Sequence, residues 1–217
     1  MLYIVATPIG NLKDITLRAI EVLKEVDLIA CEDTRHSRIL LSAYGIHTPT
    51  TSYFQHNRFT KARYLLERMK GGAKVALISD AGTPGILDPG YHIINLAIQS
   101  NIPITVIPGA TAFISALVLS GKPMHKFIFE GFLPKKSVAR RKKLEELKNL
   151  NYTLVFYESC HRIMKSLEDI QAVFGDIPIV VVRELTKKFE EAIRFKVSQI
   201  REYLAKGKPR GEFVVVI

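Results

Sequence analysis

Residues that could transfer a proton or hold an anion follow an apolar run near the start of the chain. The run, residues 28–31, is typical of a buried strand, and the stretch EDTR at 32–35 comes directly after it. In an open α/β sheet, the loops that follow the strands carry the ligand-binding residues. A carboxylate there can accept a proton, and an arginine can orient a carboxylate or hold a phosphate. We therefore take Glu32, Asp33 and Arg35 as candidate catalytic residues, with a surface ion-pair network as the alternative.

A glycine-rich stretch at residues 79–90 is the second candidate. It contains three glycines and two prolines in twelve residues, and it follows the apolar run 74–78. Such a loop can turn sharply and approach a ligand closely, while Asp80, Thr83 and Asp88 offer oxygens. It fits neither the Walker A pattern nor GxGxxG, so the standard nucleotide fingerprints are absent. A tight strand-to-helix turn without a ligand is the plainer interpretation.

The first half of the chain must position these loops, and its pattern alternates strands with helices. We expect strands at 2–6, 28–31, 74–78 and 104–107, and helices from 14, at 36–43, at 58–70, at 90–100 and up to about 121. A linker that includes 53–57 precedes the third of these helices. This alternation predicts a parallel sheet.

The second half predicts a mixed sheet. We expect strands at 127–130, 153–157, 178–183, 189–195 and 212–217, with helices up to about 149, from 158 to 174 and at 197–206. The short connection between 183 and 189 favours antiparallel neighbours. Lys122-Pro123 is the candidate boundary, so the expected α/β domains are 1–122 and 123–217.

Composition narrows the class of protein. The 217 residues include 31 Lys and Arg against 21 Asp and Glu, a formal net charge of +10, which favours a polyanionic partner. Cys31 and Cys160 are the only cysteines and no Cys/His cluster has zinc spacing, so we expect no disulfide framework and no metal. The N-terminus lacks the pattern of a signal peptide, and the uncharged stretch 89–121 is interrupted by prolines and glycines. We expect a cytoplasmic protein.

One run of basic residues stands out as a candidate RNA-binding surface. It lies at the start of the expected helix that ends near 149 and has six cations and no acid: Lys135, Lys136, Arg140, Arg141, Lys142 and Lys143. Such a run can neutralise backbone phosphates. The alternative is a helix face that only contacts solvent.

Several long motifs in order resemble the tetrapyrrole methylase superfamily. Within it they resemble most the branch that methylates the ribose 2′-oxygen of a cytidine in small-subunit ribosomal RNA. The motifs lie at 5–19, 31–35, 79–85, 107–112, 156–159, 161–162, 182–187 and 211–213. One departure is Thr83, which stands where related tetrapyrrole enzymes have an aspartate.

The resemblance implies a class III methyltransferase fold of two α/β domains with S-adenosylmethionine in the cleft between them, and commonly a homodimer. Carried over by motif, the cofactor contacts are Pro8, Ile9, Thr83, Ile86, Thr111, Ala112, Tyr157, Leu185, Glu212 and Phe213. It also implies methylation of small-subunit ribosomal RNA. A carboxylate near the cleft could accept the proton of the hydroxyl, and Asp33 or Glu32 is our leading hypothesis for that base. No metal is needed for that chemistry.

Two other functions stay open from the sequence. The same scaffold could methylate a tetrapyrrole or cobalamin precursor, since those substrates are also polyanionic. Alternatively, a ribosome-binding protein could retain the fold without catalysis. Its affinity for RNA would then not depend on the cofactor. The stretches 7–11 and 32–35 resemble the RNA branch and favour RNA methylation over methylation of a tetrapyrrole.

Overall fold

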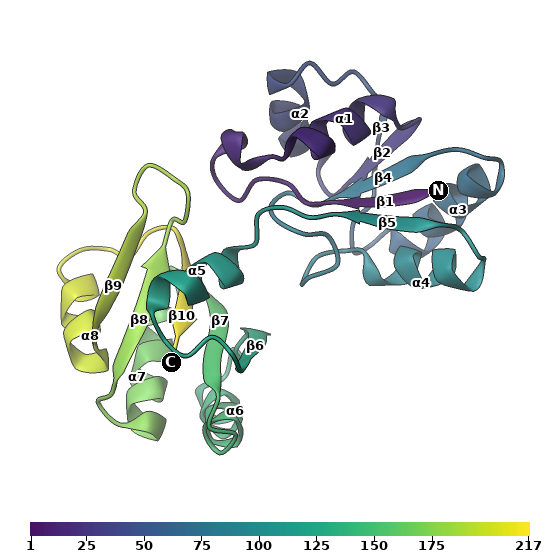
Figure 1. Ribbon diagram of the computed structural model, residues 1–217. Coiled ribbons are helices and arrows are strands. Elements are labelled where there is room, and N and C mark those ends of the chain that lie inside the picture. The colour runs from purple at the N-terminus through teal and green to yellow at the C-terminus, as the bar shows by residue number, and fades with distance from the viewer. The chain divides into compact units, whose positions relative to one another are not determined.

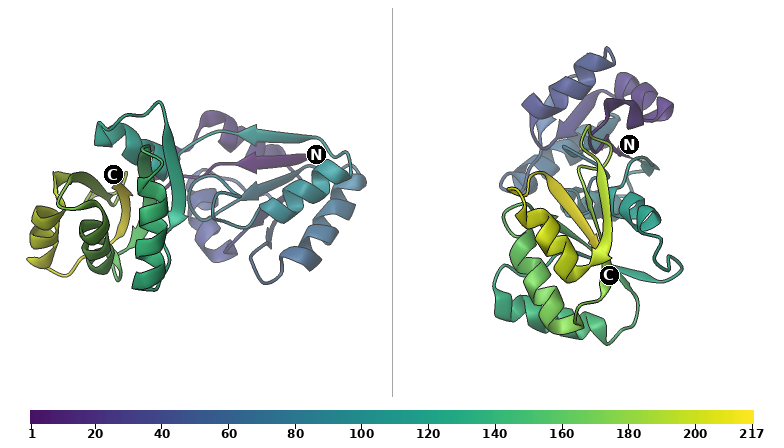
Figure 2. Two further views of the ribbon diagram at one scale, coloured as in Figure 1. Left: turned by 90° about the horizontal axis from the view of Figure 1, so that it is seen from below. Right: turned by 90° about the vertical axis from the view of Figure 1, so that its left-hand side faces the viewer.

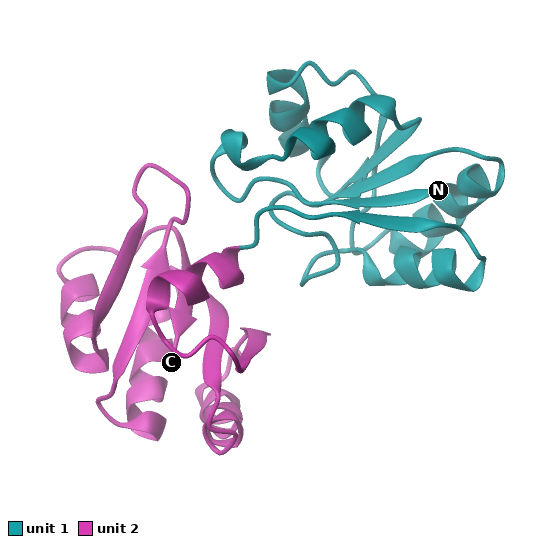
Figure 3. Cartoon of the chain, in the orientation of Figure 1, with its two compact units in different colours: residues 1–111 teal, residues 112–217 magenta.

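Five parallel strands form the sheet of the first unit, residues 1–111 of the 217 that the computed structural model describes (Figures 1 and 3). Their order is β3-β2-β4-β1-β5. The strands are β1 (Leu2–Val5), β2 (Leu28–Cys31), β3 (Thr50–Ser52), β4 (Val75–Ile78) and β5 (Ile104–Ile107). The parallel sheet is confirmed, but β3 was not predicted. It is a short polar edge strand, Thr-Thr-Ser, inside the stretch that we expected to be a linker.

Helices cover both faces of this sheet (Figure 1). On one face, α1 (Leu17–Glu25) and α2 (Thr34–Ala43) pack on strand residues such as Ile29 and Ile78. On the other, α3 (Arg58–Lys70) and α4 (Tyr91–Gln99) pack on residues such as Ala30 and Leu77. Successive side chains of a strand point to opposite faces, so two cores form on one sheet. A short 3₁₀ helix, η1 (Leu12–Asp14), precedes α1.

The second unit, residues 112–217, is built on a mixed sheet of order β6-β7-β10-β8-β9. Its elements are α5 (Ala112–Ser120), β6 (Phe127–Phe132), α6 (Ser137–Lys148), β7 (Thr153–Ser159), α7 (Ile163–Phe174), β8 (Pro178–Arg183), β9 (Glu191–Lys196), α8 (Val197–Ala205) and β10 (Glu212–Val216). Only β6 and β7 are parallel neighbours, and β8 and β9 form the antiparallel pair expected from the sequence. Helices α6, α7 and α8 share one hydrophobic core on this sheet (Figure 2).

The division between the units falls at Thr111–Ala112, before the boundary that we expected at Lys122-Pro123. The reason is the packing of α5, which contacts β7, β8, β9 and β10 of the second sheet. Lys122, two residues after the end of this helix, is anchored to the same sheet, because its Nζ donates to the Pro178 carbonyl at 2.8 Å. No helix of the structure is long and apolar enough to span a membrane.

A buried ion pair joins α6 to α7 and corrects one expectation. Arg140 was expected to meet RNA phosphates, but it is 2% exposed and its guanidinium Nη2 lies 2.6 Å from the Asp169 Oδ2. It also donates to the carbonyls of Pro134 and Lys135. Arg141 donates to the Asp169 Oδ1 at 2.6 Å. Arg140 is therefore a structural cation, because a buried guanidinium held on three sides cannot reach a phosphate.

The rest of the basic run divides into paired and unpaired residues. Arg141 is half exposed and shares Asp169, and the Lys143 Nζ lies 3.4 Å from the Glu130 Oε1. Lys135, Lys136 and Lys142 are exposed. Only these three lysines of the predicted RNA surface extend from α6 and its start without an ion pair.

We predict that Asp169→Asn lowers the free energy of unfolding by about 3–5 kcal/mol, because it leaves Arg140 buried without a countercharge. Burial alone would raise the pKa of Asp169, but hydrogen bonds from Arg141, Ser137 and Arg140 lower it overall. The carboxylate thus stabilises the protein above the pKa of the unfolded chain, and this contribution disappears as the pH falls through the lowered folded pKa. The gap between variant and wild type should close in the same range.

The matched control is Glu168→Gln, the same change one residue earlier in α7. Glu168 is exposed and pairs with Arg201 at the surface, where such pairs contribute about 0–1 kcal/mol. Urea unfolding followed by circular dichroism measures both variants. Equal losses in the two variants would contradict a structural role for the Arg140–Asp169 pair.

Candidate functional site

The predicted site residues of the first unit gather at one edge of its sheet. Because β1, β2, β4 and β5 are parallel, the loops after them meet at their carboxyl ends. Strand β1 lies between β4 and β5. The connection from β1 to β2 passes β4, and the connection from β4 to β5 passes β1, so the two connections run in opposite directions along the sheet. This is the reversal of strand order at which open α/β sheets bind ligands.

Backbone hydrogen bonds tie the loop after β1 to the glycine-rich loop after β4. The Thr7 amide donates to the Gly82 carbonyl at 2.9 Å, and the Gly82 amide donates back at 3.1 Å. The buried Thr7 hydroxyl donates to the Ser79 carbonyl at 3.0 Å. Gly82 has φ +81°, a left-handed conformation that favours glycine. The two loops therefore form one connected surface that contains Ile9 and Thr83.

The loop after β5 meets the end of β1 at a point with no room for a side chain. A Cβ added to Gly109 would lie 2.9 Å from the Cβ of Ala6. At Gly82 the space is ordinary, since a Cβ would be 3.6 Å from the Ile9 side chain. Glycine is thus required at Gly109 by close packing and at Gly82 by the backbone angle. A Cβ at Gly82 would also lie 3.8 Å from the Ala110 carbonyl oxygen, so the loop after β5 comes close to the glycine-rich loop.

Three carboxylates, Glu32, Asp80 and Asp88, belong to loops at this edge and influence one another through their charges. Glu32 is half-buried, and its pKa is raised first by burial and then by the negative charges of Asp88 and Asp80. The pKa of Asp88 is also raised by burial, with a hydrogen bond from Ser79 acting in the opposite direction. The Asp33 amide donates to the Asp80 Oδ1 at 3.3 Å, which links the loops after β2 and β4. A carboxyl with a raised pKa holds a proton more readily near neutral pH.

The other two predicted catalytic residues pair with each other at the start of α2. The Asp33 side chain accepts the Arg35 amide at 2.8 Å as a helix cap, and the Arg35 Nη2 lies 2.9 Å from the Asp33 Oδ2. Hydrogen bonds from Arg35 lower the pKa of Asp33 to about 2. A carboxylate of that pKa is a weak base, so the direction of the two pKa shifts makes Glu32 the better candidate for a proton acceptor than Asp33.

The remaining predicted cofactor residues of the first unit vary in exposure. Pro8 is buried, Ile9, Thr83 and Thr111 are half-buried, and the Ile86 side chain is exposed beside the equally exposed Leu87. The Ile86 amide donates to the Thr83 carbonyl at 3.3 Å. Leu87 has φ +68°, in the left-handed region. The turn thus presents two apolar side chains to the surface at the sheet edge.

The predicted cofactor residues of the second unit differ in burial and in their contacts. Tyr157 packs edge to face on Phe129, with ring centroids 5.1 Å apart, and Ala112 begins α5. Leu185 is buried, and Glu212 pairs with Lys187 at 2.8 Å. The Phe213 side chain is 1% exposed and belongs to the hydrophobic core. Its strand pairs with β7 on one side and β8 on the other, and the expected cofactor contact of Phe213 stays a prediction.

The motif at 156–162 has a structural explanation that its sequence did not show. Glu158 is buried and accepts the Ser159 amide at 2.8 Å and the Ser166 hydroxyl at 2.6 Å. The Arg162 Nη2 lies 3.3 Å from Glu158 and donates to the Leu133 carbonyl at 2.6 Å. These contacts hold β7, α7 and the end of β6 together. No group of three or more His, Cys, Asp or Glu side chains is arranged to hold a metal ion.

Comparison with known proteins places this geometry in context. The family model described as Tetrapyrrole (Corrin/Porphyrin) Methylases matches residues 1–201. The chain is 50% identical over 220 residues to the Haemophilus influenzae protein named Ribosomal RNA small subunit methyltransferase I, covering 100% of this chain and 78% of that protein. Proteins of the same name from other bacteria match at similar identity, and the one from Thermotoga maritima is 45% identical with 97% of its length covered.

Solved structures show the same fold at low identity. Cobalt precorrin-4 methyltransferase has a TM-score of 0.74 and 19% identity, with 99% of this chain and 93% of that chain covered. Uroporphyrin-III C-methyltransferase from Thermus thermophilus, complexed with S-adenosyl homocysteine, has a TM-score of 0.67 and 18% identity, with 99% and 96% covered. The predicted fold class of two α/β domains is therefore confirmed.

The carboxylates give a direct prediction for this site. In the wild-type protein, Asp33 should titrate near pH 2, and Glu32 should titrate above the ordinary range of a glutamate. Asp88→Asn removes a negative neighbour, so ionisation of Glu32 becomes easier and its pKa should fall. Carboxyl-carbon NMR titration measures both groups. Glu21→Gln, at an exposed position of α1, is the control and should leave both pKa values unchanged. An unchanged Glu32 pKa in the Asp88→Asn variant would contradict the electrostatic coupling between Glu32 and Asp88.

Proposed function

The chain belongs to the tetrapyrrole methylase family, and from that premise we propose that it transfers the methyl group of S-adenosylmethionine to small-subunit ribosomal RNA. The observation that carries this proposal is the match to proteins named Ribosomal RNA small subunit methyltransferase I, at 50% identity and across the whole chain. The finer proposal is that the acceptor is the ribose 2′-hydroxyl of a cytidine. It rests on the motif resemblance at 5–19 and 31–35.

The loops of the first unit fit S-adenosylmethionine chemically. This cofactor carries no phosphate, which suits loops without a phosphate-binding fingerprint. Exposed Ile86 and half-buried Ile9 offer apolar surface for an adenine, and the Thr83 and Thr111 hydroxyls offer partners for polar groups. Glu32, Asp80 and Asp88 place negative charge at this edge of a protein whose net charge is +10, which favours a cationic sulfonium there. We assign Pro8, Ile9, Thr83, Ile86 and Thr111 to the cofactor, together with Ala112, Tyr157, Leu185 and Glu212 of the second unit.

Glu32 is the residue to which we assign the proton. When bound, the cofactor supplies a methyl group already activated by positively charged sulfur. The protein then has to align the hydroxyl and remove its proton. The Glu32 carboxylate would take up that proton while the bound cofactor would supply the methyl group to the hydroxyl oxygen. Burial and the nearby Asp88 raise the proton affinity of Glu32 for this role. Asp33 and Arg35 hold the start of α2, and so the loop that carries Glu32.

The test of this assignment compares two amide variants. Glu32→Gln should keep its affinity for S-adenosylmethionine and lose roughly 100-fold or more in methyl transfer, the usual scale for loss of a general base. Asp33→Asn keeps a helix-capping side chain and should retain most of the activity. Transfer of labelled methyl to assembled small subunits, naked ribosomal RNA and tetrapyrroles is measured in parallel, with cofactor affinity by calorimetry. Near-wild-type turnover of Glu32→Gln would remove Glu32 as the base, and labelling of tetrapyrroles alone would overturn the RNA substrate.

RNA binding by α6 gives a separate prediction. We propose that Lys135, Lys136 and Lys142 contact phosphates, so replacing all three with glutamine should flatten the slope of log affinity against log salt by about 2 to 3 units. Replacement of Lys24, Lys206 and Lys208, three exposed lysines elsewhere, changes the net charge equally and is the control. Equal slopes for the two triple variants would show that α6 acts only through overall charge.

A further inference from the structure

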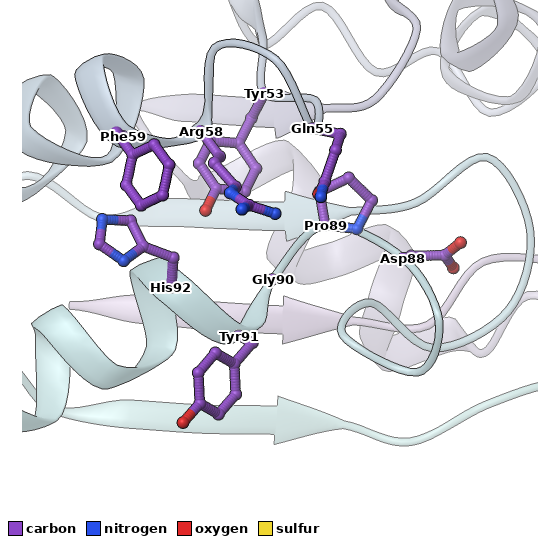
Figure 4. A pocket seen from close by; sticks show the side chains of 9 residues that line it. All are labelled: Tyr53, Gln55, Arg58, Phe59, Asp88, Pro89, Gly90, Tyr91 and His92. Atoms are coloured by element: carbon purple, nitrogen blue, oxygen red, sulfur yellow. The ribbon is translucent and has the colours of Figure 1, made fainter.

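A cavity of about 320 Å³ lies in the first unit, beside the glycine-rich loop (Figure 4). Its walls come from the segment between β3 and α3 and from the start of α4. It is lined by Tyr53, Gln55, Arg58, Phe59, Asp88, Pro89, Gly90, Tyr91 and His92. The volume lies within the range of small-molecule sites, about 300–1,000 Å³. None of the predicted catalytic or cofactor residues lines it.

Exposed aromatic rings border this cavity together with a cation. Tyr91 is 78% exposed and Phe59 is 56% exposed, which is high for large apolar side chains. His92 meets Phe59 edge to face with ring centroids 4.7 Å apart, and the Arg58 guanidinium lies 4.8 Å from the Phe59 ring centroid. Rings that face solvent beside an arginine are the elements with which proteins stack single-stranded bases and hold their phosphates.

The Tyr53 hydroxyl is an independent sign of a ligand. Tyr53 is 1% exposed, yet its hydroxyl oxygen has no hydrogen-bond partner of good geometry, although the backbone of Ile93 approaches it. A buried hydroxyl normally has a partner, because leaving it unpaired carries the desolvation cost of the group. This side chain lines the cavity, where a polar atom of a bound molecule can supply the partner.

The segment that borders the cavity packs on the glycine-rich loop of the candidate site. A Cβ on Gly90 would lie 2.8 Å from the Cα of Gly85, so the start of α4 packs directly on the loop that carries Thr83 and Ile86. Asp88 lines the cavity and is also the charge that acts most strongly on Glu32. The cavity and Glu32 therefore have Asp88 as a common neighbour.

We propose that this cavity receives one nucleotide of the RNA substrate, with its base against Phe59 and Tyr91, a phosphate on Arg58, and a polar edge on the Tyr53 hydroxyl. This inference rests on the proposed function, since it names part of the same substrate. A single-stranded segment is the form that fits, because a base must leave its helix to stack on side chains.

The experiment uses the full chain with S-adenosyl homocysteine and two short single-stranded RNAs of equal length and charge, one of cytidines and one with abasic riboses at its centre. Phe59→Ala and Tyr91→Ala should each weaken binding of the cytidine RNA about 5- to 100-fold and leave the abasic RNA unaffected, because only stacking is lost. Tyr64→Ala removes an exposed ring of the same helix outside the cavity and is the control. Arg58→Gln should flatten the salt slope by about one unit, whereas Arg63→Gln, at an exposed position of α3, should flatten it less.

Tyr53→Phe removes the hydroxyl group and keeps the buried ring, so it tests the role of the hydroxyl alone. It should weaken binding of the cytidine RNA about 2- to 12-fold, the scale of one hydrogen bond, while leaving the free energy of unfolding nearly unchanged because no hydrogen bond of good geometry is lost in the free protein. Equal binding of both RNAs by wild type, or ring variants that behave like Tyr64→Ala, would overturn the pocket even if ribosomal RNA is still methylated. Lower affinity for S-adenosyl homocysteine in the ring variants would also overturn it and would assign the cavity to the cofactor. A wild-type protein that methylates no RNA would instead refute the proposed function.

Discussion

The paired hydrogen bonds between Thr7 and Gly82 are the constraint on which the rest of the site depends. They join the ends of β1 and β4, which are neighbours in the sheet, and so fix where the glycine-rich loop begins. Gly109, packed on Ala6, fixes the loop after β5 against the same strand end. With three loops attached to one central strand, the exposed turn at Ile86 has a defined position on a rigid support. A site on such a support loses little entropy when a ligand binds.

Charge is distributed unevenly in this protein, and the distribution suits two ligands of opposite sign. The surplus of ten positive charges lies mainly on exposed lysines and arginines, while Glu32, Asp80 and Asp88 gather at one sheet edge. A cationic cofactor is attracted to the edge, and a polyanionic substrate is attracted to the surrounding surface. Arg58 and Asp88 both line the cavity, so it has a positive and a negative group among its lining residues.

The sequence predicted the sheets, most helices and the edge that carries the site, because short apolar strands followed by glycine, proline and polar residues are local signals. It missed β3, whose three polar residues look like a loop. Arg140 could have been recognised, since it has the same helical spacing as Leu144 and Leu147, which face the core. Its partner Asp169, and the coupling of Glu32 to Asp88, depend on contacts between distant segments and could not be read from spacing. The choice of Glu32 over Asp33 therefore required the structure.

Gly82 and Gly109 differ in how readily another residue can replace them. At Gly82 the obstacle is the backbone angle, and asparagine can adopt left-handed angles at a modest cost, so the position has a route to another residue. At Gly109 the obstacle is the neighbouring Ala6, and every other amino acid brings a Cβ into the same place. Another residue at Gly109 requires that the chain first loses the Ala6 methyl group or moves the end of β1, since the next nearest atom, the Ala6 carbonyl oxygen, would lie at an ordinary 3.6 Å. In a saturation library, Gly82 should thus tolerate a narrow set of residues and Gly109 none.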